Sequence, residues 1–187
     1  GKRSIYDVPI ASAYGKGSDG FLLEFTDSIA TAAAAVNSQG VLCQSLSSMC
    51  KVCHPKSKGE VTLSATGNAN VDFNFYSDES DLDVMLNCTR QMLAINNVFS
   101  ARGMDLTGID ALNDAGLTEH IRSTTISSHH AFGTCRMGTG PLDVVDERLR
   151  VRGIRNLRIA DASVIPDGPC SGPMATVYAL GEKAAEM

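Results

Sequence analysis

The sequence predicts an α+β fold in which an antiparallel sheet packs against helices on one side. Residues 60–65 and 71–76 each alternate apolar with polar or charged side chains, a pattern typical of strands with one buried face. A turn sequence, Thr66-Gly67-Asn68, separates them. A helix then begins at Ser77 or Asp78 and extends to about residue 99. Its apolar stripe consists of Leu82, Met85, Leu86, Met92 and Leu93.

The remaining elements are predicted from weaker patterns. Residues 21–36 favour a helix that ends at Gln39-Gly40, and residues 41–52 fit either a strand or a helix. A short helix is expected within 100–123. A short strand is expected at 157–160, and a final helix at 174–187.

Composition excludes several classes of function. The chain has 187 residues, of which 43% are hydrophobic and 20% charged, with a net charge of −5. This is a globular composition, and it lacks the basic patch that nucleic-acid binding requires. No apolar run approaches the roughly 20 residues of a membrane span. The chain starts with Gly1 rather than Met and shows no signal peptide, so we expect a processed product or a fragment.

The cysteines indicate a compartment. Six of them occur at irregular spacing, which does not fit a small disulfide scaffold. We expect reduced thiols, and therefore a location in the cytosol, a chloroplast or a mitochondrion. The run Cys50-Lys51-Val52-Cys53-His54 also fits c-type haem attachment or a redox dithiol, which are less favoured alternatives.

Residues 127–138, Ser-Ser-His-His-Ala-Phe-Gly-Thr-Cys-Arg-Met-Gly, contain the strongest candidate for catalysis. Thr124 to Met137 has few helix-forming residues and many small or β-branched ones, so an extended segment is predicted. Adjacent side chains of a strand point to opposite faces. Only one of His129 and His130 can therefore face a pocket.

Three blocks in this order resemble the glucose–methanol–choline (GMC) family of FAD-dependent oxidoreductases. They are residues 54–63, residues 127–138 and residues 145–166. The resemblance implies that His130, three residues before the Gly of Gly-Thr-Cys, is the catalytic base for a CH–OH donor. A histidine suits this role because its pKa lies near neutrality.

The resemblance also implies a domain organisation and a cofactor. Residues 1–52 form a segment of uncertain structure. Residues 53–143 form a substrate-binding domain, and residues 144–187 contribute a strand and a helix to an FAD-binding domain. The implied FAD contacts are Asp161 and Ala162, near the diphosphate, and Met174, Ala175 and Thr176, at the N-terminus of the last helix beside the flavin ring.

Part of the expected site is missing from the sequence. The dinucleotide fingerprint between a strand and a helix is absent, so a further chain or region must supply it, in an assembly larger than this chain. The family's second catalytic residue, His or Asn, falls on Gly172.

Two alternatives to alcohol oxidation follow. One is an algal fatty acid photodecarboxylase-like enzyme, in which Cys53 would be functional and the substrate a fatty acid. That branch also uses an arginine, which is absent between Cys53 and Arg90. The other alternative is a non-catalytic subunit derived from the family.

Overall fold

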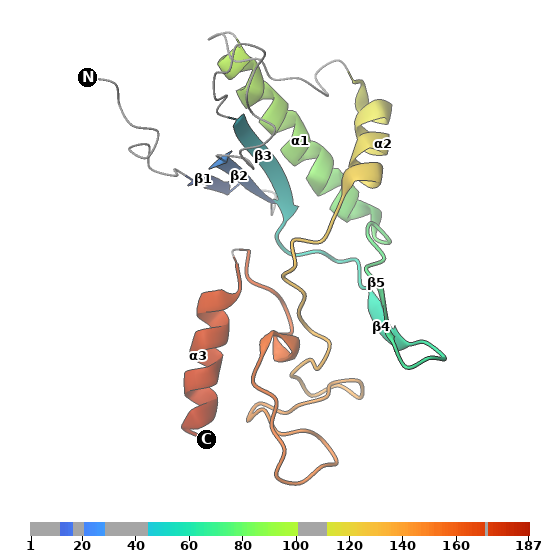
Figure 1. Cartoon of the computed structure of the whole chain (residues 1–187), viewed down its shortest axis with the longest axis vertical. Coiled ribbons are helices and arrows are strands. Elements are labelled where there is room, and N and C mark those ends of the chain that lie inside the picture. The colour runs from blue at the N-terminus through green and yellow to red at the C-terminus, as the bar shows by residue number, and fades with distance from the viewer. Residues whose placement is uncertain (1–11, 17–20, 29–44, 101–111, 171) are drawn as a thin grey trace, which may run out of the picture.

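A computed structural model describes residues 12–16, 21–28, 45–100, 112–170 and 172–187. It confirms an α+β fold with an antiparallel sheet and helices. The elements in chain order are β1 (Ser12–Lys16), β2 (Phe21–Ser28), β3 (Ser45–Val52), β4 (Glu60–Leu63), β5 (Ala69–Asp72), α1 (Glu79–Ser100), α2 (Asp114–Thr124), the 3₁₀ helix η2 (Ala162–Val164) and α3 (Met174–Ala185). The sheet, α1 and α2 form an upper body, and α3 lies below it with the irregular segments (Figure 1).

The larger sheet is antiparallel with strand order β1-β2-β3. The register places Leu23 of β2 opposite Cys50 of β3. The helix predicted for residues 21–36 is therefore wrong over 21–28, and residues 29–44 lie outside the described part of the chain. Phenylalanine and threonine favour strands, and pairing with β3 outweighs the local helical pattern.

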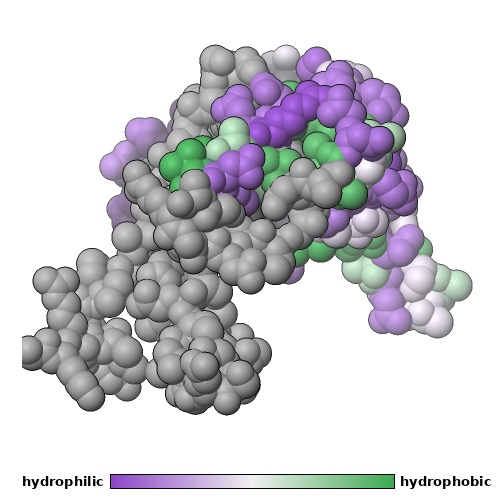
Figure 2. Space-filling model, turned by 90° about the horizontal axis from the view of Figure 1, so that it is seen from above, coloured by the Kyte–Doolittle hydropathy of each residue, from purple (hydrophilic) through white to green (hydrophobic). Residues whose placement is uncertain are grey.

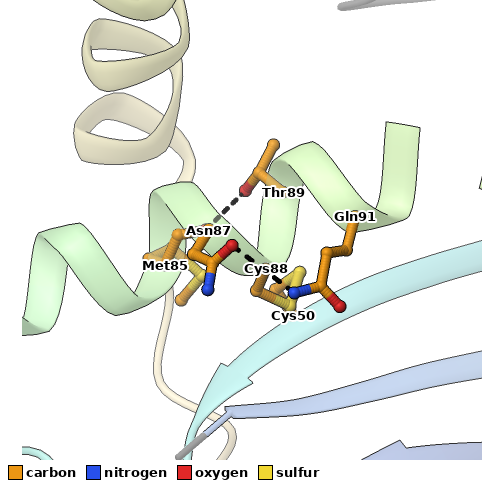
Figure 3. The surroundings of a disulfide bond; sticks show 6 residues. All are labelled: Cys50, Met85, Asn87, Cys88, Thr89 and Gln91. Carbon is orange, nitrogen blue, oxygen red and sulfur yellow. Dashed lines mark hydrogen bonds between the residues drawn. A yellow bond between two sulfur atoms is a disulfide. The ribbon is translucent and has the colours of Figure 1, made fainter. Parts of the chain in front are cut away.

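Helix α1 covers the sheet and is joined to it covalently. It packs against β2, β3 and α2. A disulfide links Cys50 of β3 to Cys88 of α1 (Figure 3). Cys88 is fully buried, with Val84 and Met92 packed around it. The upper surface over this body is mainly hydrophilic in its described part, with smaller hydrophobic areas between (Figure 2).

Two disulfides overturn the expectation of reduced cysteines. Besides Cys50–Cys88, Cys53 is bonded to Cys170, 117 residues further along the chain. Cys50 and Cys53 thus have different partners, which leaves neither a haem-binding pair nor a redox dithiol between them. Folding brings these distant residues together, so their spacing in the sequence could not reveal the pairing. Cys135 is free.

Strands β4 and β5 form the predicted pair, with Val61 opposite Val71. The expected buried face is absent, because Val61, Leu63 and Val71 are 53%, 78% and 51% exposed. The hairpin extends from the body (Figure 1). No other described element pairs with it, so the apolar positions of both strands are left uncovered.

Asp81, in the first turn of α1, fixes the segment that precedes β4. Its side chain is buried, and its two carboxylate oxygens accept hydrogen bonds from the amides of Lys56 and Ser57 at 2.9 and 2.8 Å. In return, the Ser57 hydroxyl oxygen accepts from the amide of Asp78 at 3.1 Å. These bonds hold residues 56–57 against the N-terminus of α1, where a carboxylate is also favoured by the helix dipole.

The lower part of the chain has its own small core. Val145, Leu149 and Val164 are fully buried together, and Leu180 and Ala184 of α3 pack against them. The strand expected at 157–160 is reduced to a single bridge between Arg150 and Arg158. Irregular backbone satisfies its hydrogen bonds here through turns and not through a continuous ladder.

The turn at 146–150 depends on one carboxylate. Asp146 accepts hydrogen bonds from the amides of Arg148 and Arg150 and from the Arg150 guanidinium. The pKa of Asp146 is lowered to about 2, and the hydrogen bond from the Arg150 guanidinium is the largest cause. Leu149 is held with a positive φ of 62° while its side chain fills the core. This backbone conformation is costly for leucine, so the Asp146 bonds have to stabilise it.

Two absences apply only to the residues described here. No helix among them has the length and apolar character needed to cross a membrane. No group of His, Cys, Asp and Glu side chains in that part of the chain could hold a metal ion.

We predict that Asp81→Ala lowers the free energy of unfolding by roughly 1–3 kcal/mol, because the amides of Lys56 and Ser57 lose the buried carboxylate that accepts their hydrogen bonds. Asp83→Ala is the matched control, since Asp83 is exposed on the same helical turn, and its effect should stay within about 0.5 kcal/mol. Urea unfolding of both variants measures the difference. Equal losses would show that Asp81 does not fix the 56–57 segment.

We also predict a pH-dependent effect for Asp146→Ala. The folded-state pKa of Asp146 is lowered from 3.8 to about 2, so its contribution is fully present above the unfolded pKa and is lost as pH falls through the folded one. The Tm difference between the wild type and Asp146→Ala should therefore shrink as pH falls from 5 towards 2. Glu147→Ala, on the neighbouring exposed residue, should show no such trend.

Candidate functional site

The main cavity among the described residues has a volume of about 660 Å³ and is lined by four stretches of chain. They are residues 50–61, residues 71–85, residues 125–136 and residues 166–173. The first two belong to β3, the β4–β5 hairpin and the start of α1. The last two are irregular segments that follow α2 and η2. The segments that line the cavity run where the upper body meets the lower part of the chain (Figure 1).

One wall is built by Asp81 and the residues it binds. Pro55, Ser57 and Gly59 line this side of the cavity. Asp81 binds the amides of residues 56–57. This wall is therefore fixed to the N-terminal end of α1 and is not a free loop. The 54–63 block is recognisable in the sequence, but the role of Asp81 is not. The available signal for Asp81 is an acidic residue in the first turn of the following helix.

A second wall depends on Tyr76. Its hydroxyl lies 2.5 Å from Thr125 Oγ1. Thr125 Oγ1 also donates to the carbonyl oxygen of Ile121 at 2.7 Å, which uses its one proton, so Tyr76 is the donor in the shared bond. Burial, partly offset by this bond, raises the pKa of Tyr76. The contact joins the segment between β5 and α1 to the segment that carries the two histidines.

The histidine segment is not the extended strand that the sequence predicted. Thr124 ends α2, and residues 125–136 are irregular. His129 has a positive φ of 61°, and its amide donates to the Ser127 hydroxyl at 3.1 Å. This turn conformation replaces the simple alternation of a strand. Of the two histidines, His130 is the one that lines the cavity.

His130 faces the loop that leads into α3. A Cβ atom placed on Gly172 would lie 3.5 Å from Cε1 and 3.9 Å from Nε2 of His130. Both distances are ordinary van der Waals contacts, so a small side chain at residue 172 would fit. Residue 172, to which the family resemblance assigns the second catalytic residue, lies beside His130, and its glycine leaves space there.

The predicted cofactor residues fall in two places. Met174, Ala175 and Thr176 occupy the first turn of α3 and are exposed, directly after Pro173 on the cavity wall. Asp161 instead caps η2. Hydrogen bonds from the Ser163 hydroxyl, which has the largest effect, and from the Ser163 amide lower the pKa of the Asp161 carboxyl. The structure thus brings the start of α3 next to His130 but leaves Asp161 and Ala162 away from the cavity lining.

Two lining residues carry chemistry that the sequence did not indicate. The Arg136 guanidinium donates to Asp143 at 2.6 Å, and this bond, foremost, lowers the pKa of the Asp143 carboxyl. The sulfur of Cys170 is bonded to Cys53, and both cysteines line the cavity. The sequence contained one signal for each residue. Arg136 lies inside the 127–138 block, and Cys170 lies in a proline-rich stretch.

Comparison with solved structures supports the fold. A variant of the formate oxidase of Aspergillus oryzae RIB40, from a study of FAD modification, matches 89% of this chain and 31% of its own, at 27% identity and a TM-score of 0.72. A fungal aryl-alcohol oxidase matches 88% of this chain and 27% of its own, at 29% identity and a TM-score of 0.64.

Curated relatives share the same region. An alcohol dehydrogenase [acceptor] of Pseudomonas putida is 34% identical over 143 residues, which is 71% of this chain and 25% of that protein. The oxygen-dependent choline dehydrogenase of Vibrio vulnificus is 32% identical over 142 residues, again 71% and 25%. The chain thus spans about a quarter of the length of these relatives.

The family model for GMC oxidoreductase matches residues 55–181. That range includes the cavity wall at 55–61, the histidine segment, η2 and most of α3. The matched residues make up more than half of the sequence, and the resemblance of the three blocks points the same way. This chain belongs to the GMC oxidoreductase family.

Proposed function

We propose that this chain forms the substrate side of an FAD-dependent oxidoreductase that acts on CH–OH donors, with His130 as the catalytic base. The observation that carries the proposal is the position of His130, on a cavity wall beside the residue that precedes α3. The names of two relatives, choline dehydrogenase and alcohol dehydrogenase, favour an alcohol as substrate. Within this scheme, residues 53–143 form the substrate-binding part and residues 144–187 complete the FAD-binding domain.

The start of α3 fits the flavin end of FAD. The first amides of a helix have no acceptor within it, and Pro173 provides no side-chain cap for them. Met174 is 69% exposed, and Ala175 and Thr176 are exposed as well. Free N–H donors and the positive end of the helix dipole favour an electron-rich group. Asp161 and Ala162 would lie nearer the diphosphate, as the family resemblance implies.

His130 would hold the substrate hydroxyl and accept its proton. FAD, when bound, supplies the acceptor for the hydride that leaves the same carbon. A neutral imidazole nitrogen accepts a hydrogen bond and then a proton near neutral pH. Because residue 172 is a glycine, no second side chain at that position shares the proton, and His130 would act as the single base.

The adenosine end of FAD needs a partner that carries the dinucleotide fingerprint. Apolar side chains of the β4–β5 hairpin and of α3 are exposed in this chain, among them Leu63 at 78% and Tyr178 at 71%. Exposed apolar surface of this kind marks contacts with other protein. We propose that the region with the fingerprint covers it, as another part of the polypeptide or as a separate chain.

The photodecarboxylase alternative gains no support. It required a functional thiol at Cys53, but Cys53 is bonded to Cys170. The non-catalytic subunit is the alternative that the experiments below decide.

His130→Gln should lower kcat by about 10²–10⁴-fold, because glutamine cannot accept the substrate proton. His129→Gln is the matched control, and its effect should stay below about threefold. Steady-state kinetics on an alcohol series, with flavin content measured for each variant, gives both numbers. A loss below about threefold for His130→Gln would remove it from the role of base.

The native protein, isolated with the region that carries the fingerprint, should show the absorption bands of bound flavin. A matched pair of variants, Ala175→Pro and Ala185→Pro, places the same substitution at opposite ends of α3. Proline at the second position of the helix removes one of the free amides, so Ala175→Pro should weaken flavin binding at least about tenfold. A colourless protein that does not take up FAD would contradict the proposal and favour the alternative of a non-catalytic subunit.

A further inference from the structure

Residues 126–134 carry His130 along the cavity but are weakly attached to the rest of the fold. All of them except His129 line the cavity. Within the described part of the chain they form no hydrogen bond with another element, and their one such bond is internal, from the His129 amide to the Ser127 hydroxyl. The position of His130 therefore depends on what holds the two ends of this stretch.

The far end is attached through the backbone. The amides of Cys135 and Met137 donate to the carbonyl oxygens of Ser163 and Val164, each at 2.9 Å. These bonds pair the end of the histidine segment with η2 and so attach it to the lower core, which contains Val164. None of them involves a side chain of the upper body.

The near end is attached through one side chain. The amide and the hydroxyl of Thr125 both donate to the carbonyl oxygen of Ile121, at 2.9 and 2.7 Å, but these bonds lie within the end of α2. The bond from the Tyr76 hydroxyl to Thr125 Oγ1, at 2.5 Å, is the one that ties Thr125 to a different described segment. Tyr76 is thus the near anchor of the stretch that carries His130.

The ring of Tyr76 is itself fixed on several sides. Tyr76 is 8% exposed and packs in one cluster with Leu82 and Ile121. The Arg122 guanidinium lies 5.7 Å from the ring centroid, within the range of a cation–π contact. Arg122 is held in turn by both carboxylate oxygens of Glu79, at 2.9 and 2.8 Å. The hydroxyl is therefore a fixed point to which Thr125 is attached.

Tyr76 reaches this position in an unfavourable backbone conformation. Its φ is +59°, a region that bulky residues seldom occupy. Such conformations cost free energy, persist only where the surroundings impose them, and cluster at functional sites. The apolar cluster needs only the ring, which a phenylalanine would supply equally well. The hydroxyl is the part of this side chain that packing does not explain.

We propose that Tyr76 is a positioning residue for His130, which acts through Thr125. Its hydroxyl fixes the start of residues 126–134, while the pairing with η2 fixes their end, and His130 is held between the two attachments. The effect on turnover rests on the proposed function, but the effect on the segment does not.

Four variants test the anchor in the enzyme assembled with FAD and the region that carries the fingerprint. Tyr76→Phe removes only the hydroxyl, so kcat should fall about tenfold with KM changed less than about twofold, because His130 is displaced and not removed. Thr125→Val should give a similar loss, and Thr125→Ser, which keeps Oγ, should stay within about twofold of the wild type. Thr118→Val is the matched control and should also stay within about twofold. Thr118 donates to the carbonyl four residues earlier as Thr125 does, without Tyr76 as a donor to it.

The double variant separates positioning from general destabilisation. Tyr76→Phe combined with Thr125→Val should lower kcat no further than Thr125→Val alone, to within about twofold, because both changes remove the same bond. Losses that multiply, or a loss below about threefold for Tyr76→Phe alone, would overturn the proposal.

Hydrogen exchange on Tyr76→Phe tests the segment without reference to turnover. The amides of Thr125 and His129 are the hydrogen-bonded ones at this end. Their exchange should rise at least about threefold, with the amides of Cys135 and Met137 unchanged. Unchanged exchange at Thr125 and His129 would overturn the anchor whatever the activity. A wild-type protein without turnover would argue against the proposed function, and the exchange result would still decide whether Tyr76 anchors the segment.

Discussion

The chain from Cys50 to Ser57 is attached to three other parts of the molecule, and the cavity depends on these attachments. Cys50 is bonded to the middle of α1, and the amides of residues 56–57 are bound by Asp81 at its beginning. Cys53, between them, is bonded to the loop before α3. Eight consecutive residues therefore position the sheet, the long helix and the C-terminal part of the chain relative to one another.

This arrangement compensates for a divided hydrophobic core. The buried residues of the described chain form three separate clusters, around Cys88, around Tyr76 and Ile121, and around Val145 and Leu149. None of these clusters is large, and small cores supply little stability on their own. Disulfides and buried carboxylate bonds connect clusters that do not touch. The apolar positions of the β4–β5 hairpin and α3 remain exposed in the described chain, and they are the surfaces that the proposed further region would cover.

Periodicity in the sequence was enough to predict α1, α3 and the β4–β5 pair, because each has a local pattern that its own hydrogen bonds satisfy. It did not predict β2, whose conformation depends on pairing with β3, nor the lack of a buried face on the hairpin. Both depend on what lies beside a strand, which sequence periodicity does not contain. The disulfides were missed for the same reason, since the fold and not the spacing brings Cys53 to Cys170.

For the candidate site, the motif identified His130 although the local structure differed from the prediction. The argument from strand alternation does not apply, because His129 adopts a left-handed conformation and the segment turns. The family pattern selects His130 whatever the backbone conformation of the segment, and His130 is the histidine that lines the cavity. Gly172 illustrates the converse. Its lack of a side chain was evident in the sequence, but only the structure shows that the space it leaves adjoins His130 and lies two residues from the sulfur of Cys170. In this chain the loop that carries Gly172 also carries a cysteine of a disulfide, so the geometry around His130, the proposed base, depends on a covalent bond elsewhere in that loop.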